Sequence, residues 1–211
     1  MNSCPLCGRA SLFFFYQDKR RSYLRCNHCH IVVVPPEYLL CAEAEKSVYD
    51  QHENDPQDKK YRRFLSRTFE PLIALLPDDA KGLDFGCGPG PTISVMAEEV
   101  GLLVSNYDLY YHNTPEVLEH YYDFVTITEV IEHVADAKAL LTRLDSLLSS
   151  GGVLAVMTSR MVDAGAFGQW YYKNDPTHIR FYSIETFEWV AHHFDWHLEI
   201  VDRDVVFFHK K

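Results

Sequence analysis

The stretch Leu83-Asp84-Phe85-Gly86-Cys87-Gly88-Pro89-Gly90 decides the fold of this 211-residue chain. Its apolar start indicates the end of a strand, and its three alternate glycines indicate a sharp turn whose backbone can approach a ligand closely. Pro91 suits a first helical position, and apolar residues at helical spacing continue to Gly101. A strand, a glycine turn and a helix N-terminus predict a nucleotide site. The alternative is a glycine-rich loop without a ligand.

The motif departs from the dinucleotide fingerprint. A G-x-G-x-x-G match beginning at Gly86 needs glycine at position 91, where this chain has Pro91, so NAD and FAD are disfavoured. An acidic residue two positions before G-x-G-x-G resembles motif I of class I S-adenosylmethionine-dependent methyltransferases. That resemblance implies that the methionine end of S-adenosylmethionine is held by Asp84, Gly86, Cys87, Gly88 and Gly90.

Segments after the turn fit the same family. Residues 102–108 predict a second strand that ends in Asp108, at a distance from the turn that suits an acid binding ribose hydroxyls. Residues 122–134 predict a third strand, and its Glu-Val-Ile-Glu-His-Val ending resembles ubiquinone-biosynthesis-type methyltransferases. In that group this ending borders the sulfonium and the substrate, which places Thr128 and Glu129 beside the cofactor.

The remaining pattern predicts an α/β fold, a Rossmann-like, mostly parallel sheet that finishes in an antiparallel hairpin. A leucine-rich helix should close at Gly151-Gly152 before a strand over 153–158, and Ser183 should cap a helix that runs to Phe194. Strands 196–201 and 205–209 are joined too tightly for a parallel crossover. Only 14 residues separate Asp108 from Asp123, so the family's third strand should be reduced or missing, together with its adenine-contacting acid.

The N-terminus carries a separate motif. Cys4-Pro5-Leu6-Cys7 and Cys26-Asn27-His28-Cys29 are two C-x-x-C pairs with 18 residues between them, a spacing typical of structural zinc held by four thiolates. Disulfides would need an oxidising compartment, and the chain has no room for a leader before Cys4; a redox motif would need a βαβ setting. We therefore expect a zinc ribbon over residues 1–36, a methyltransferase domain over 45–211 and a cytoplasmic location.

The segment 45–77 precedes the core at 78–211. Similar methyltransferases fold this part over the cofactor as a lid, and by that resemblance Tyr49, Asn54 and Tyr61 contact cofactor or substrate. A solvated linker followed by a packing helix is the alternative. Pro71 should kink or split that helix.

The stretch from Trp170 to Ser183 should lie over the carboxyl edge of the sheet, where ligands of open α/β sheets bind. Its D-x-T-H-x-x-F-Y-S string resembles small-molecule methyltransferases that place a histidine toward the active site. We expect His178 first and His133 second to be catalytic, acting as a base if the acceptor is a hydroxyl or ammonium, although an isolated histidine is often structural. Further residues expected to shape the substrate pocket are Trp170, Asp175 and Tyr182.

Charge and composition bear on the acceptor. The chain has a net charge of −10 and no apolar run long enough for a membrane helix. Residues 1–40 hold five basic and two acidic residues, whereas the remainder holds 15 and 28. An acidic body repels phosphate backbones, so nucleic acid is an unlikely partner and a small-molecule acceptor is favoured.

Three function classes follow from the sequence. The first is methyl transfer from S-adenosylmethionine to a small molecule. The second is a ribosomal RNA or other nucleic-acid methyltransferase that uses the ribbon for RNA contact, opposed by the absence of an N-P-P-Y or D-P-P-Y motif. The third is a non-catalytic adaptor that binds the cofactor or a partner. The sequence assigns neither the acceptor nor the oligomeric state.

Overall fold

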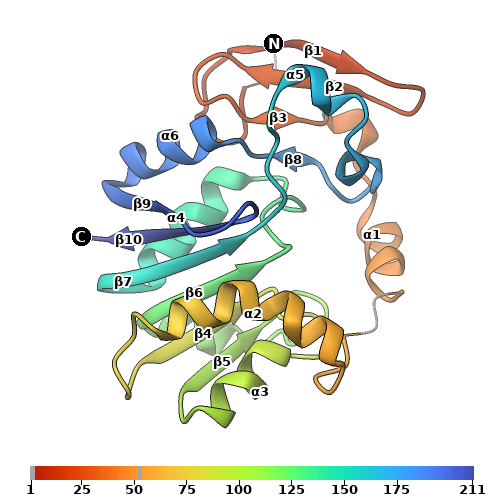
Figure 1. Ribbon diagram of the computed structural model, residues 1–211. Helices are drawn as coiled ribbons and strands as arrows, with labels where there is room; N and C mark the ends of the chain where they lie inside the picture. The colour runs from red at the N-terminus through yellow and green to blue at the C-terminus, as the bar shows by residue number, and fades with distance from the viewer. Residues whose placement is uncertain (1–2, 52–53) are drawn as a thin grey trace.

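The computed structural model describes residues 3–51 and 54–211, and its centre is a six-stranded sheet (Figure 1). The strand order is β5-β4-β6-β7-β10-β9, with β10 antiparallel to both of its neighbours and the other pairs parallel. The strands are β4 (Lys81–Phe85), β5 (Leu103–Tyr107), β6 (Tyr122–Thr128), β7 (Leu148–Met157), β9 (Trp196–Ile200) and β10 (Val205–Lys210). The predicted α/β fold with a terminal hairpin is confirmed.

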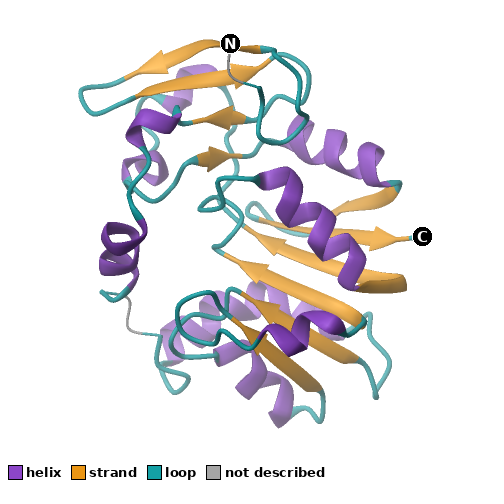
Figure 2. Cartoon of the chain, turned by 180° about the vertical axis from the view of Figure 1, so that it is seen from behind, coloured by secondary structure: helices purple, strands orange, loops and turns teal. Residues whose placement is uncertain are grey.

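Helices cover both faces of this sheet, as the view from behind in Figure 2 also shows. On one face α2 (Lys59–Ile73) and α3 (Thr92–Glu99) pack on Phe124 and Phe207. On the other, α4 (Ala137–Leu147) and α6 (Ile184–Phe194) pack on Val125 and Phe208. Neighbouring residues of one strand thus face opposite layers, as strand geometry requires.

No strand lies between β5 and β6, a part of the chain described in full. Between them the described chain forms a short 3-10 turn (Pro115–Glu119), so the prediction that the third strand is reduced or missing is confirmed. Ser183 caps α6, because its side chain accepts a hydrogen bond from the amide of Thr186. One predicted boundary is wrong: the helix was expected to close at Gly151-Gly152, but α4 ends at Leu147 and β7 begins at Leu148. The strand begins earlier than predicted because Leu148 pairs with Tyr122 of β6.

A second sheet lies above the first and contains the N-terminal residues (Figure 1). Its order is β1-β2-β3-β8, from β1 (Leu12–Gln17), β2 (Ser22–Cys26), β3 (Val32–Val33) and β8 (Arg180–Phe181). The fourth strand therefore comes from the C-terminal third of the chain. The segment before β8 adds α5 (Ala164–Phe167) and a 3-10 turn (Tyr171–Asn174). The expected ribbon at 1–36 does not form its sheet alone.

The connection between the two sheets passes the carboxyl ends of the parallel strands. It includes a 3-10 turn (Pro36–Tyr38) and α1 (Ala42–Tyr49), which lies beside that edge (Figure 1). The following helix α2 is not split at Pro71 but ends two residues later, so the proline removes only a bond near its last turn. Among the described helices, none has the length and apolarity to cross a bilayer.

Candidate functional site

The glycine turn follows β4 and is bonded to the end of β5. Gly86 and Gly88 have φ angles of 81° and 66°, which side chains disfavour, and the amides of Gly86 and Cys87 donate to the carbonyl of Tyr107. The carboxylate of Asp108 accepts hydrogen bonds from the amides of Gly88 at 3.0 Å and Tyr110 at 2.8 Å. The acid after β5 is thus fixed beside the turn, as its spacing in the sequence predicts.

The segment before α2 packs directly on this turn. A Cβ on Gly90 would stand 1.5 Å from the carbonyl oxygen of Asn54, and one on Gly88 would stand 2.6 Å from its side-chain nitrogen. Farther back, α1 is held over the strand ends, because Tyr110 donates to Glu45 at 2.7 Å. The ring of Tyr49 stands edge-on to His133, with centroids 5.3 Å apart. The segment therefore covers the carboxyl edge of the sheet as a lid does.

A cavity of about 1090 Å³ lies between this lid and the strand ends. That volume is slightly above the roughly 300–1,000 Å³ typical of small-molecule sites. The structure brings most of the predicted site residues to its wall: Tyr49, Asn54, Tyr61, Gly86, Gly88, Asp108, Thr128, Glu129, His133, Asp175 and His178. One cavity thus joins the glycine turn to the two histidines.

Two carboxyl groups lie near the end of β6: Glu132 is fully buried and Glu129 is partly buried. Glu129 has a left-handed backbone with φ of 53°, held by a hydrogen bond from its amide to the Met157 carbonyl. The Tyr172 hydroxyl makes a short hydrogen bond to Oε1 of Glu132, and its oxygen lies 3.1 Å from Oε2 of Glu129. Burial raises the pKa of Glu129 to about 9 and that of Glu132 to about 7. The sequence analysis did not name Glu132 or Tyr172 as site residues, although they lie in the stretches 122–134 and 170–183 that it singled out.

The two predicted histidines meet at this point. Their ring centroids are 4.7 Å apart, with His178 on the loop before β8 and His133 on the turn after β6. Nδ1 of His133 is 3.1 Å from the Thr177 carbonyl, and Nδ1 of His178 is 2.8 Å from that of Tyr172. Burial, together with the nearby ring of His133, lowers the pKa of His178 to about 4. His178 is therefore neutral at neutral pH.

Five predicted site residues lie away from the cavity wall. Asp84 is 2% exposed beneath the turn, where it accepts a hydrogen bond from the Thr126 hydroxyl at 2.7 Å. Cys87 is buried, and Gly90 packs against the backbone of Asn54. Trp170 stacks on Tyr172 within the upper sheet's core. Tyr182 is fully buried beside α6. The expectation that Trp170 and Tyr182 shape the pocket is corrected, because aromatic side chains here fill the core instead.

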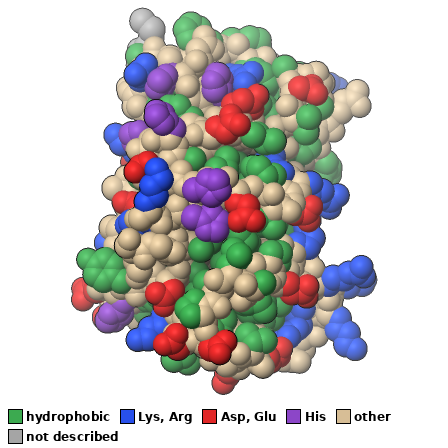
Figure 3. All heavy atoms as spheres, turned by 60° about the vertical axis from the view of Figure 1, so that its left-hand side comes forward, with side chains coloured by type: hydrophobic (Ala, Val, Ile, Leu, Met, Phe, Trp, Pro, Cys, Tyr) green, Lys and Arg blue, Asp and Glu red, His purple; other side chains and the backbone are tan. Residues whose placement is uncertain are grey.

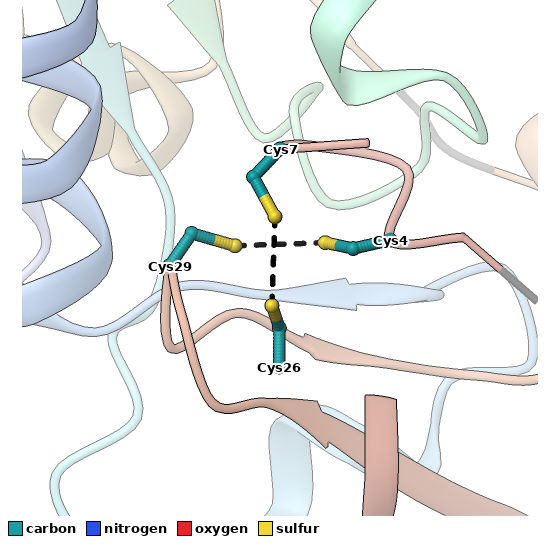
Figure 4. A group of neighbouring side chains, drawn as sticks. All are labelled: Cys4, Cys7, Cys26 and Cys29. Atoms are coloured by element: carbon teal, nitrogen blue, oxygen red, sulfur yellow. Dashed lines mark hydrogen bonds between the residues drawn. The ribbon is translucent and has the colours of Figure 1, made fainter. Parts of the chain in front are cut away.

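The four predicted metal-binding cysteines converge (Figure 4). Their sulfurs all lie within 4.8 Å of one another, with Cys4 to Cys29 at 3.5 Å and Cys7 to Cys26 at 3.6 Å. Four thiolates around one zinc ion at about 2.3 Å would be about 3.8 Å apart. The donor set therefore fits a tetrahedral ion. His28 points elsewhere, with its Nε2 accepting from the indole of Trp189.

A family model described as a methyltransferase domain matches residues 52–200, most of the chain. No curated protein sequence gives a significant match. Many solved structures share the fold at low sequence identity.

Three solved structures illustrate the likeness, each with a TM-score of 0.53. The 1,6-didemethyltoxoflavin-N1-methyltransferase of Burkholderia thailandensis, solved with 1,6-didemethyltoxoflavin and S-adenosylhomocysteine bound, is 16% identical over 94% of this chain and 99% of that one. A SAM-dependent methyltransferase from Archaeoglobus fulgidus is 18% identical, over 65% and 71%. CalO1, a methyltransferase in calicheamicin biosynthesis, is 12% identical over 81% of this chain, which spans 58% of that longer protein.

Proposed function

The chain belongs to the methyltransferase domain family, and from this premise we propose that it transfers a methyl group from S-adenosylmethionine to a small-molecule acceptor. The observation that carries the proposal is the single cavity that joins Gly86, Gly88 and Asp108 at one end to His133 and His178 at the other. A methyl donor and an acceptor must lie within one enclosed space for in-line transfer.

The donor end fits S-adenosylmethionine. Gly88 lines the cavity with its backbone alone, and the carboxylate of Asp108, also on the cavity wall, has lone pairs beyond those that accept from backbone amides. By the family resemblance Asp108 would hold the ribose, while Asn54, Tyr61, Thr128 and Glu129 would lie along the rest of the cofactor. S-adenosylmethionine supplies an electrophilic methyl group on a sulfonium. The protein's part is therefore positioning and exclusion of water.

The acceptor end holds the candidate catalytic groups. A new bond forms between the acceptor atom and the methyl carbon while the carbon–sulfur bond breaks, and its electron pair stays on sulfur. A hydroxyl or ammonium acceptor also loses a proton, and His178 or His133 would accept it at Nε2. Acidic Asp175 lines this end and is 3.9 Å from His178. Alanine at His178 should slow turnover without weakening cofactor binding; unchanged turnover would contradict the base role.

Asp108→Asn tests the donor end. Exchanging the carboxylate for an amide puts a donor where backbone amides already point, so we expect roughly tenfold weaker S-adenosylmethionine binding, about 1.4 kcal/mol. Isothermal titration calorimetry measures it, with exposed Asp79→Asn as the control. Unaltered affinity in Asp108→Asn would place the cofactor elsewhere.

Labelled S-adenosylmethionine and size-fractionated cell extract test the acceptor class. We expect label in the small-molecule fraction. Label in RNA or protein would overturn the small-molecule assignment, and cofactor binding without transfer to any fraction would indicate an adaptor.

We further propose that Cys4, Cys7, Cys26 and Cys29 bind a structural zinc ion, supported by the convergence of their sulfurs. The amide of His28 and the hydroxyl of Ser11 approach Cys26 Sγ at 3.4 and 2.9 Å, as donors to a thiolate would. Strong chelation should expose the upper sheet to protease while the central sheet stays folded. Limited proteolysis with mass spectrometry checks this, and an intact upper sheet after verified metal removal would contradict it.

A further inference from the structure

Three side chains that could ligate a metal meet at the wall of the cavity, apart from the cysteine site. One ligand atom from each of Glu132, His133 and His178 lies within 4.8 Å of the other two. Nε2 of His133 is 3.8 Å from Oε1 of Glu132. Movements of about an ångström would bring all three to the roughly 2.0–2.2 Å at which imidazole and carboxylate bind zinc.

Both imidazoles are oriented as metal ligands are. Each Nδ1 lies at hydrogen-bond distance from a backbone carbonyl, at 3.1 Å for His133 and 2.8 Å for His178. A carbonyl only accepts, so Nδ1 carries the proton and the lone pair is on Nε2. Ligating histidines are usually fixed in this way by their second nitrogen.

Glu132 supplies an independent observation. Its side chain has no solvent exposure, and Oε2 has no hydrogen-bond partner among the described residues, while Oε1 accepts from Tyr172. A buried carboxylate oxygen without a partner is costly. The oxygen that lies 3.8 Å from Nε2 of His133 is Oε1, so a cation held by both oxygens of Glu132 would also give Oε2 a partner and remove that cost.

The backbone holds the three groups together. The amides of Ile179 and Arg180 both donate to the Glu132 carbonyl, at 2.9 and 3.0 Å. The guanidinium of Arg180 donates to the Ala135 carbonyl at 2.6 Å. The turn after β6 and the loop before β8 are therefore joined at two points next to the three side chains.

We propose that Glu132, His133 and His178 bind a second metal ion, a first-row divalent cation such as Zn²⁺, held by two imidazoles and one carboxylate. Two nitrogens and one oxygen match the His₂Glu sets that zinc uses in open sites, and leave at least one coordination position. Both histidines line the cavity whereas Glu132 lies behind them, so the open position faces the cavity.

The role of this ion rests on the proposed function. An oxygen of the acceptor would take the open position, and the cation would lower the pKa of an acceptor hydroxyl. The imidazoles would then act as ligands through Nε2, and the proton of the acceptor hydroxyl would pass to water in the cavity instead of to a histidine. Metal binding itself can be measured without any acceptor or turnover.

Metal content of the full chain tests the proposal. After loading with Zn²⁺ and desalting, elemental analysis should find two ions per chain in the unmodified protein and one in Glu132→Gln and His178→Ala. The remaining ion, at the cysteine site, shows that each variant is folded. The matched control His192→Ala replaces an exposed histidine of α6 and should keep two ions.

Cobalt distinguishes the two sites by their spectra. The first equivalent of Co²⁺ should show thiolate-to-metal charge-transfer absorption, and the second should add only the weak visible bands of nitrogen and oxygen ligands, which His178→Ala should abolish. One ion per unmodified chain, or a second ion that persists in both variants, would overturn the site. Failure of methyl transfer with two ions bound would instead overturn the proposed function.

Discussion

Asp84 shows how one residue can link the site to the stability of the fold. It is buried beneath the glycine turn with Thr126 as its hydrogen-bond donor. Burial, together with the nearby charge of Asp108, raises the pKa of this carboxyl from 3.8 to about 7. The folded protein therefore binds this proton more tightly than the unfolded chain does.

The sign of the pH dependence follows. Because the folded-state pKa lies above the unfolded one, Asp84 makes the free energy of unfolding decrease as pH rises from about 4 to about 7. Asp84→Asn keeps an acceptor for Thr126 but cannot ionise. We expect the variant to match the unmodified protein near pH 4 and to exceed its stability at pH 8 by on the order of 2–4 kcal/mol. Urea unfolding at several pH values measures this difference.

The exposed substitution Asp78→Asn is the control, and should leave the pH dependence unchanged. A constant stability difference between Asp84→Asn and the unmodified protein from pH 4 to 8 would contradict the prediction. The comparison is made without cofactor, because a bound sulfonium would alter the charges near the turn.

Sequence reasoning was strongest where a residue's role depends on its place at a strand end. Asp108 and Glu129 follow parallel strands directly, and such ends meet at one edge of the sheet. It was weakest for Trp170 and Tyr182, since an aromatic residue in a loop can line a cavity or fill a core. Only the packing partners, here Tyr172 and Phe187, decide between these.

Among the elements, the lid and the glycine turn form one packing unit. The chain at Asn54 passes so close to Gly90 that a single methyl group could not be placed between them. The period of apolar residues predicted the helices and the hairpin, but it could not predict this contact. Likewise β8 has only two residues, too few for any periodicity to show that it joins the N-terminal sheet.

Gly90→Ala tests this unit. The added Cβ would stand 1.5 Å from the Asn54 carbonyl, so the lid must move away. We expect faster hydrogen exchange at residues 54–58 and S-adenosylmethionine binding weakened by about tenfold, or 1.4 kcal/mol. Hydrogen exchange with mass spectrometry and calorimetry provide the two measurements.

Gly165→Ala is the control, because it adds the same methyl group within α5, outside the lid and the glycine turn, where the nearest atom is Oδ1 of the helix-capping Asp163 at 3.1 Å. Both quantities should stay unchanged there. If Gly90→Ala leaves lid exchange unaffected, the close approach of Asn54 to the turn is not a property of the protein in solution.

In the whole molecule, the N-terminal sheet and the loop that carries His178 share one core. Phe167 of that loop packs edge-on against Phe15 and Tyr23, with centroids 5.1 and 5.0 Å apart. The sequence suggested a separate ribbon because the cysteine spacing is local. A 36-residue module is too small to bury enough apolar surface, and the distant loop completes its core.

The charges on the surface of the molecule are mixed. Figure 3 shows acidic, basic and histidine side chains interspersed on the face that bears α6 and β10, and on this face of the described chain they form no continuous basic area. The five basic residues near the N-terminus are partly engaged, since Arg21 is 7% exposed and bonds the loop. Their presence is therefore weak support for RNA binding.

Arg21→Lys tests whether the ribbon positions the loop. The guanidinium donates to the carbonyls of Lys173, Asp175 and Pro176, at 2.6, 2.9 and 3.3 Å. An ammonium is a point donor without this fork, so some of these buried carbonyls would lose their partner. We expect hydrogen exchange at residues 175–180 to accelerate by roughly tenfold, about 1.4 kcal/mol of local opening, while S-adenosylmethionine affinity changes less than twofold.

Arg9→Lys, at an exposed arginine of the same module, should alter neither quantity. The contrast separates a positioning role from general loss of stability, because global destabilisation would also increase exchange in β4 and weaken cofactor binding. Unchanged protection of the loop in Arg21→Lys would mean that β8 and the Phe167 cluster hold His178 without the arginine. Accelerated exchange confined to the loop would instead mean that the N-terminal module acts on the acceptor end of the cavity and leaves the donor end alone.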